Sequence, residues 1–161
     1  MSLDLTVTRT FDVPVEQVWQ AWTEPEHVKR WWGPDGFTAP IAEMDVREGG
    51  TSLVCMRSPG GAEFYNTWTY HRVAPSERLE FDMGFADANG NAAHPAELGL
   101  PPDIPPAVRH VVTFEPVGPA RTELTVTEHG YTSPQTVEIS KLGLEQCLDK
   151  MAVELSGNGA R

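Results

Sequence analysis

The sequence has few cysteines and no long apolar run. Cys55 and Cys147 are the two cysteines among 161 residues, and they form neither a CxxC pair nor a disulfide framework. No apolar run approaches the roughly 20 residues that span a bilayer. The first residues, Met-Ser-Leu-Asp-Leu, lack the basic and apolar regions of a secretion signal. We therefore expect a cytoplasmic protein with reduced, buried thiols and no insertion into membranes.

Basic residues are also scarce. The chain has 12 Lys and Arg against 23 Asp and Glu, which gives a formal net charge of −11. Nucleic-acid binding requires clustered positive charge against the phosphates, and negative charge opposes docking on an anionic membrane surface. The composition therefore argues against both kinds of partner.

Patterns typical of metal sites, phosphate loops and nucleophilic catalysis are absent as well. Neither cysteine stands beside a base that could activate it. The pairs Gly49-Gly50 and Gly60-Gly61 are not followed by Lys-Ser/Thr, so they predict turns. No HExxH, HxE or Cys/His spacing links the five histidines, which are His27, His71, His94, His110 and His129. We expect no metal and no cofactor.

What the chain does contain is strand periodicity over most of its length. The length fits one domain with one core, which we expect over residues 1–157 with a frayed tail at 158–161. Arg9 falls on the apolar face of the first strand, so either a bulge turns its side chain away or it lies at the sheet margin with a carboxylate partner. The alternative is a solvated arginine at the strand end. Alternating residues predict strands over 3–11, 37–46, 51–57, 63–73, 79–85, 109–115 and 122–128.

Two short helices are expected after the first strand. Pro14 suits the first position of a helix, and an apolar stripe runs from Val15 to Trp22. The segment Thr23-Glu-Pro-Glu26 has the pattern of a capping box. It predicts a second helix that includes Trp31 and Trp32 and stops at Gly33-Pro34.

A long helix is expected at the C-terminus. Thr132 or Ser133 serves as its N-cap and Pro134 as its first residue, while Gly157 lies past its end. The segment 86–107 is a long loop with one short helical turn at 95–98, and we expect it to form an ordered flap. A curved antiparallel sheet covered by this single helix leaves a gap that the short helices close at one end.

Five sequence motifs occur in order along the chain. They are Arg9-x-Phe11-x-x-Pro14, Val18-Trp19-x-Ala21-x-Thr23-x-Pro25, Trp31-Trp32-Gly33-Pro34, Asp45-x-Arg47-x-Gly49-Gly50 and Leu142-Gly143-Leu144-x-x-Cys147-Leu148. In this order they resemble the "activator of Hsp90 ATPase homologue 1-like" branch of the START/Bet v 1-like (SRPBCC) superfamily, and the resemblance covers nearly the whole chain. It implies an α+β helix-grip fold, in which a curved six- to seven-stranded antiparallel sheet surrounds a long C-terminal helix.

The chain departs from the pattern of this family at two positions. Ser52 and Leu144 stand where many relatives carry tryptophan. A smaller side chain at either position is expected to enlarge the cavity or to change its polarity.

His110 is the one polar side chain that we single out for chemistry. It shares strand parity with Val112 and Phe114, so it is expected to face the concave side of the sheet, either as a ligand contact or general base or as a strand-end histidine bonded to backbone or water. Both parities of 63–73 contain aromatic residues, so the inward face of that strand stays open. The expected ligand-binding residues are Trp32, Phe37, Met56, Trp68, Tyr70, Phe81, Met83, Phe85, His110, Val112, Leu144, Leu148 and Met151.

The expected cavity, His110 and the family resemblance suggest three alternative functions. The first is a non-catalytic or weakly catalytic carrier that binds a small, largely hydrophobic molecule between sheet and helix, with the 86–107 loop and the Trp31-Trp32 turn forming the entrance. The second is an enzyme similar to the polyketide cyclases and aromatases, with His110 as its candidate catalytic residue. The third, implied by the family name, is an interaction with the chaperone Hsp90. The sequence leaves both a monomer and a homodimer open.

Overall fold

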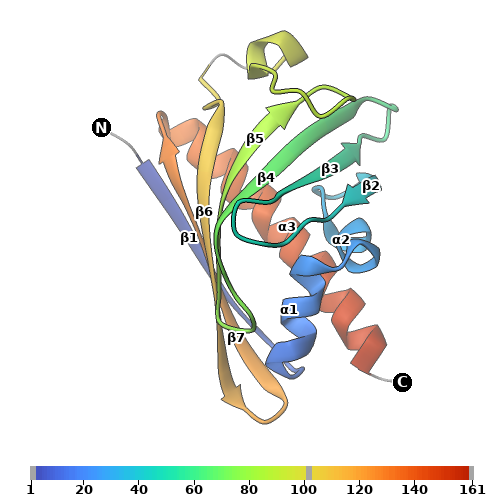
Figure 1. The fold of residues 1–161 in the computed structure, drawn as a ribbon, viewed down its shortest axis with the longest axis vertical. Coiled ribbons are helices and arrows are strands. Elements are labelled where there is room, and N and C mark those ends of the chain that lie inside the picture. The colour runs from blue at the N-terminus through green and yellow to red at the C-terminus, as the bar shows by residue number, and fades with distance from the viewer. Residues whose placement is uncertain (1–2, 101–102, 160–161) are drawn as a thin grey trace.

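A computed structural model describes residues 3–100 and 103–159 of the chain. Seven strands and three α-helices occur in it, with one short 3₁₀ helix (Figure 1). In chain order the elements are β1 (Leu3–Phe11), α1 (Val15–Thr23), α2 (Pro25–Trp31), β2 (Thr38–Glu43), β3 (Thr51–Arg57), β4 (Glu63–Ala74), β5 (Arg78–Ala86), η1 (Pro95–Leu98), β6 (Ala107–Gly118), β7 (Arg121–Tyr131) and α3 (Pro134–Gly159).

The strands form one antiparallel sheet in the order β1-β7-β6-β5-β4-β3-β2. Strands β2 to β6 each pair with the next strand in the sequence, and β1 forms the other edge of the sheet beside β7. Figure 1 shows the sheet curving around α3, with α1 and α2 at one end. The expected α+β architecture with a seven-stranded sheet and a C-terminal helix is confirmed.

The concave face of the sheet holds the core. Alternate residues of each strand point to it, because successive side chains in a strand face opposite sides. In β4 the buried residues are Asn66, Trp68 and Tyr70, so the even-numbered residues of its first part face inward. On α3 the buried positions recur at helical spacing, at Leu144, Cys147, Leu148, Met151 and Leu155.

The edge strand β2 is shorter than expected. It runs over six residues and contains Pro40, which has no N–H to donate. The pairing of β2 with β3 shifts register between Thr38 and Ile41, around that proline. An edge position is where a sheet tolerates such an interruption.

Two predictions about the starts of the short helices are wrong. Pro14 is the N-cap of α1 and not its first residue, and the N-cap of α2 is Glu24, which makes no side-chain capping bond. The expected capping box from Thr23 to Glu26 is therefore wrong. The Thr23 hydroxyl instead donates to the Trp19 carbonyl at 3.0 Å, one turn back in α1.

The long helix begins as predicted and ends later. The Thr136 N–H donates to the Ser133 hydroxyl at 3.2 Å, so Ser133 caps α3. The helix continues through Gly157 to Gly159, beyond the expected end, and residues 160–161 of the expected tail lie outside the described residues. No helix in the described part of the chain combines the length and apolarity needed to cross a membrane.

Arg9 has a carboxylate partner at the margin of the sheet. Its guanidinium donates to Asp149 on α3 at 2.6 Å and to the Glu145 carbonyl at 3.4 Å. The contact joins β1 to α3.

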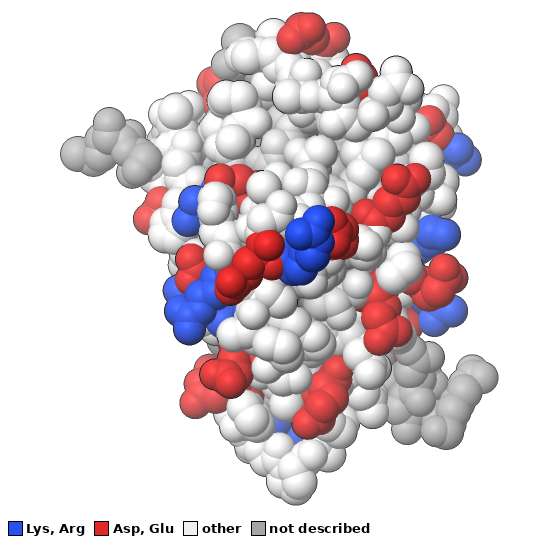
Figure 2. Space-filling model, in the orientation of Figure 1, with Lys and Arg blue, Asp and Glu red and all other residues white. Residues whose placement is uncertain are grey.

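On the face of the molecule shown in Figure 2, acidic side chains are spread over the surface with basic ones among them.

Candidate ligand-binding cavity

A cavity of about 150 Å³ lies between the concave face of the sheet and α3. Strands β3 to β7 supply one wall, α3 supplies the opposite wall, and α1, α2 and the turn after α2 close one end. Several lining residues are only half-buried, including Trp32, Met56 and Met83. These three side chains therefore lie at the rim of the cavity.

Seven of the thirteen residues expected at a ligand site line this cavity: Trp32, Met56, Trp68, Phe81, Met83, His110 and Leu144. The other six do not line it. Val112, Leu148 and Met151 are fully buried in the core, and Tyr70 is hydrogen-bonded to Ser52 at 2.8 Å. Phe37 lies against Gly33, and Phe85 lines a separate groove with residues of the 86–107 loop.

Ser52 does not enlarge the cavity, contrary to expectation. It is fully buried, and its hydroxyl oxygen accepts a hydrogen bond from the Asp45 N–H at 3.0 Å and bonds with the Tyr70 hydroxyl. Leu144 does line the cavity, so a smaller side chain there leaves more space. Of the two departures from the family pattern, one therefore bears on the cavity.

Eight further lining residues were not expected at the site: Trp22, Trp31, Pro34, Glu128, Tyr131, Ser140, Gly143 and Cys147. Those on α1 and α2 depend on how the helical pair packs against the sheet, which strand periodicity does not reveal. The inward position of Glu128 could have been predicted, because it shares strand parity with the buried Leu124 and Val126.

The long loop lies elsewhere than predicted. None of its described residues, 86–100 and 103–107, lines the cavity. The loop begins with a bridge between Ala86 and Ala92, and Ala92, Ala93 and His94 line a groove with outward-facing residues of β4 and β5. The expected helical turn at 95–98 is present as η1. Of the two segments expected at the entrance, only the Trp31-Trp32 turn is there.

Aromatic rings form most of the cavity wall. Trp68 is at their centre, with its ring centroid 6.2 Å from that of Trp22, 6.3 Å from Trp31, 5.2 Å from Trp32 and 5.0 Å from Phe81. The contacts are a mixture of stacked, tilted and edge-to-face geometries, as the ring quadrupoles favour. The wall is therefore largely apolar.

One polar cluster interrupts this wall. His110 and Glu128 are cross-strand partners on β6 and β7, each 5% exposed, and the imidazole Nε2 lies 3.2 Å from the Glu128 Oε2. The other ring nitrogen, Nδ1, donates to the Val108 carbonyl at 3.1 Å. Tyr131 donates its hydroxyl to the second oxygen of Glu128. Every hydrogen-bonding atom of the imidazole and carboxylate thus has a partner.

The two groups fix each other's charge. Burial opposes the imidazolium, but the charge and hydrogen bond of Glu128 outweigh it and raise the pKa of His110 above 6.5. Burial likewise opposes the carboxylate, but His110 and the Tyr131 hydroxyl lower the pKa of Glu128 below 4.5. Both pKa shifts favour the charged forms, an imidazolium beside a carboxylate. The net charge of this pair is zero, so it presents a dipole and not a charge to the cavity.

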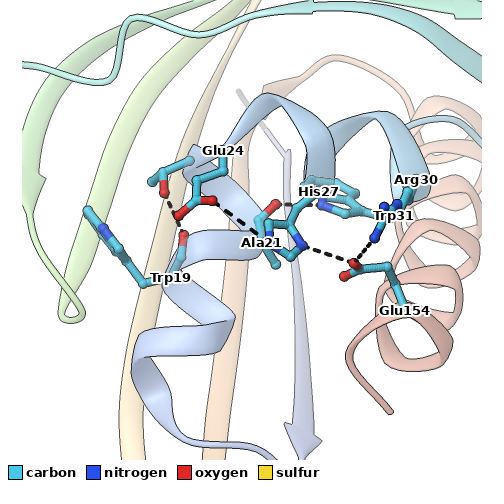
Figure 3. A network of polar contacts seen from close by, with 8 residues as sticks. Trp19, Ala21, Glu24, His27, Arg30, Trp31 and Glu154 are labelled. Carbon is cyan, nitrogen blue, oxygen red and sulfur yellow. Dashed lines mark hydrogen bonds and ion pairs between the residues drawn. The ribbon is translucent and has the colours of Figure 1, made fainter. Parts of the chain in front are cut away.

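The end of the cavity formed by α2 is held by two groups of polar contacts. The Trp31 indole N–H donates to the Ala21 carbonyl at 2.6 Å, and His27 and Arg30 each lie 2.9 Å from Glu154 of α3 (Figure 3). In the turn after α2, the Gly33 carbonyl accepts a hydrogen bond from the Lys150 ammonium of α3 at 2.8 Å. These contacts join α2 and its following turn to α1 and α3.

The two cysteine thiols do not favour nucleophilic chemistry. Burial raises the pKa of the Cys147 thiol to about 12, and burial also raises the pKa of Cys55, so neither forms a thiolate at neutral pH. No group of three or more metal-ligating side chains occurs among residues 3–100 and 103–159.

A curved antiparallel sheet around a C-terminal helix, with a cavity between them, defines a helix-grip protein of the START/Bet v 1-like class. The chain belongs to the family of activator of Hsp90 ATPase homolog 1-like proteins, whose sequence model matches residues 12–156.

Solved structures from several bacteria share the fold. A protein of the same family from Silicibacter pomeroyi is 20% identical with a TM-score of 0.78, over 97% of this chain and 99% of that chain. A protein from Arthrobacter aurescens is 27% identical with a TM-score of 0.78, over 96% and 87%. One from Mycobacterium smegmatis is 25% identical with a TM-score of 0.73, over 95% and 90%. A comparison with curated proteins found no match.

Proposed function

We propose that this protein binds one small, largely apolar molecule in the cavity between the sheet and α3. The observation that carries the proposal is a cavity walled by Trp22, Trp31, Trp32, Trp68 and Phe81. Apolar surface removed from water contributes about 25 cal/mol per Å² to binding. Aromatic side chains that are already packed in the core, such as Trp31 and Trp68, lose little further freedom when a guest enters.

The volume limits the size of that molecule. Pockets for drug-sized ligands have about 300–1,000 Å³, whereas this cavity has about 150 Å³. Apolar cavities of about 150 Å³ accept a single benzene ring. The guest is therefore one ring or a short branched chain, and a steroid or a long acyl chain is too large.

Titration with toluene tests the proposal. We expect the wild-type protein to bind toluene, detected by calorimetry and by shifts of amide resonances around the cavity. Leu144→Trp fills the cavity from α3 and is expected to abolish binding. Leu142→Trp is the matched control, because Leu142 is 57% exposed on the same helix, and it is expected to bind like the wild type. Absence of binding to the wild type would refute the proposal.

An enzyme is a second candidate, because His110 and Glu128 line the cavity. Catalysis as a general base requires a nitrogen free to take a proton, and both nitrogens of His110 are already bonded. The geometry therefore favours binding. Ring closure of a poly-β-ketone thioester by the wild type but not by His110→Gln would support the enzyme, and no turnover would dismiss it.

The chaperone interaction remains a prediction. It is supported by the family, whose description names activation of the Hsp90 ATPase. A pull-down with Hsp90 and an assay of its ATPase rate test it, and neither enrichment nor stimulation would dismiss it. A cytoplasmic location likewise remains a prediction.

A further inference from the structure

Three indole N–H groups of residues that line the cavity have no hydrogen-bond acceptor in the described part of the chain. The indole N–H groups of Trp22, Trp32 and Trp68 are buried and have no hydrogen-bond partner among the described residues. Trp22 is 2% exposed and Trp68 is 1% exposed, and all three residues line the cavity. A buried donor without an acceptor costs about 1–3 kcal/mol, so three in one cluster require an explanation.

The fourth tryptophan of the wall shows that the fold can satisfy such a donor. The Trp31 N–H donates to the Ala21 carbonyl at 2.6 Å, although Trp31 packs directly against Trp22, with 4.7 Å between their ring centroids. The donors without partners therefore belong to one contiguous group around Trp68 and are not spread through the core.

We propose that the guest is a neutral single-ring aromatic molecule with a carbonyl or equivalent acceptor, which receives hydrogen bonds from this group of indoles. The inference rests on the proposed function and specifies its ligand class. The ring of the guest packs against the aromatic wall in offset or edge-to-face contacts. Its acceptor satisfies donors that the protein leaves unpaired.

The charges around the cavity favour a neutral guest. A cation would lose its hydration in a cavity whose one carboxylate among the described residues, Glu128, is already paired with His110. An anion would lose its hydration in an apolar cavity without a free cation among its lining residues. A neutral carbonyl gains the indole donors without the cost of burying a charge.

A pair of probes of equal shape isolates the acceptor. Acetophenone and α-methylstyrene differ in that the carbonyl oxygen of the first is a methylene carbon in the second. One hydrogen bond that satisfies a buried donor corresponds to about tenfold in affinity. We therefore expect acetophenone to bind about tenfold more tightly by calorimetry. Equal affinities would overturn the inference and leave the proposed function standing, whereas binding of neither probe would overturn both.

The indole resonances report the contact directly. In ¹H–¹⁵N spectra, acetophenone is expected to shift indole N–H signals of Trp22, Trp32 or Trp68 downfield, and α-methylstyrene is not. The Trp31 signal is an internal control, because its donor is already bonded. Trp68→Phe and Trp32→Phe keep an aromatic ring but lose the donor, so at least one is expected to remove the tenfold preference. Trp19→Phe, outside the cavity, is the matched control, and a preference unchanged in both cavity variants would overturn the inference.

Discussion

His110 on β6 and Glu128 on β7 face each other within the core, with Nε2 and Oε2 3.2 Å apart. Removing one partner of a buried ion pair costs about 3–5 kcal/mol, because the remaining polar group stays buried without its partner. We expect Glu128→Ala to lower the free energy of unfolding by about that amount in urea titrations. The double variant His110→Phe, Glu128→Leu is expected to be at least about 2 kcal/mol more stable than this single variant.

A half-exposed pair on neighbouring strands provides the control for that measurement. His129 Nδ1 lies 3.1 Å from the Asp4 carboxylate across β7 and β1. Exposed pairs contribute about 0–1 kcal/mol, so His129→Ala is expected to change stability by no more than that. A similar cost for Glu128→Ala would contradict the structural role of the buried pair.

The buried pair also predicts how stability depends on pH. The pKa of His110 is raised in the folded protein, so its contribution is fully present below pH 6.5 and is lost as pH rises toward the folded-state value. Over that interval the folded state holds one more proton, and stability falls by about 1.4 kcal/mol per pH unit. The pKa of Glu128 is lowered, so its contribution is present above pH 4.5 and is lost as pH falls through its folded-state value.

The variant Glu128→Gln separates this effect from other titrating groups. Without the carboxylate, burial keeps His110 neutral, so its share of the alkaline slope disappears. The measurement is the free energy of unfolding at pH 6.5, 7.5 and 8.5 for both proteins. Parallel pH profiles of the variant and the wild type would contradict this assignment.

Two glycines are expected to respond in opposite ways to alanine. A Cβ at Gly143, within α3, would meet nothing within 4 Å, so Gly143→Ala is expected to stabilise by about 0.5–1 kcal/mol through helix propensity. A Cβ at Gly50 would lie 2.5 Å from the Asp45 carbonyl oxygen, so Gly50→Ala is expected to destabilise by about 2 kcal/mol or more. Thermal unfolding measures both, and equal melting temperatures would contradict the prediction.

The two thiols are expected to be inert in the folded protein. Cys55 and Cys147 are both buried, and the pKa of each is raised. Because the thiolate is the reactive species, an aromatic disulfide reagent at pH 8 is expected to label neither until the protein unfolds. Urea should then release two equivalents. Rapid labelling of Cys147 in native buffer would show that the cavity opens on the time scale of the assay.

Strand periodicity predicted most of the fold, because each strand buries one face and so alternates in polarity. The strand 3–11 and the helical turn at 95–98 have the predicted bounds. The capping box failed because a threonine hydroxyl can also bond back to a carbonyl one turn earlier in its own helix, as Thr23 does. Local pattern alone does not distinguish these two uses.

The residues that line the cavity were predicted where they lie on strands. They were missed where their position depends on packing between elements. Parity placed Phe81 and His110 on the concave face, and both line the cavity. Trp22 and Trp31 lie there because α1 and α2 fold back onto the sheet, and the loop residue His94 does not because its segment covers another groove. Neither placement follows from a period in the sequence.

The alignment of Phe81, His110 and Glu128 across three strands has a consequence for assembly of the sheet. If β6 slipped by one residue, His110 would turn to the solvent face, and Arg109 or Val111 would stand opposite Glu128. Arg109 is too long for the space beside Glu128 that His110 occupies. Val111 would leave the desolvated carboxylate of Glu128 without a counter-ion. Misaligned hairpins are thus penalised by electrostatics as well as by packing, and the central strands have one admissible pairing.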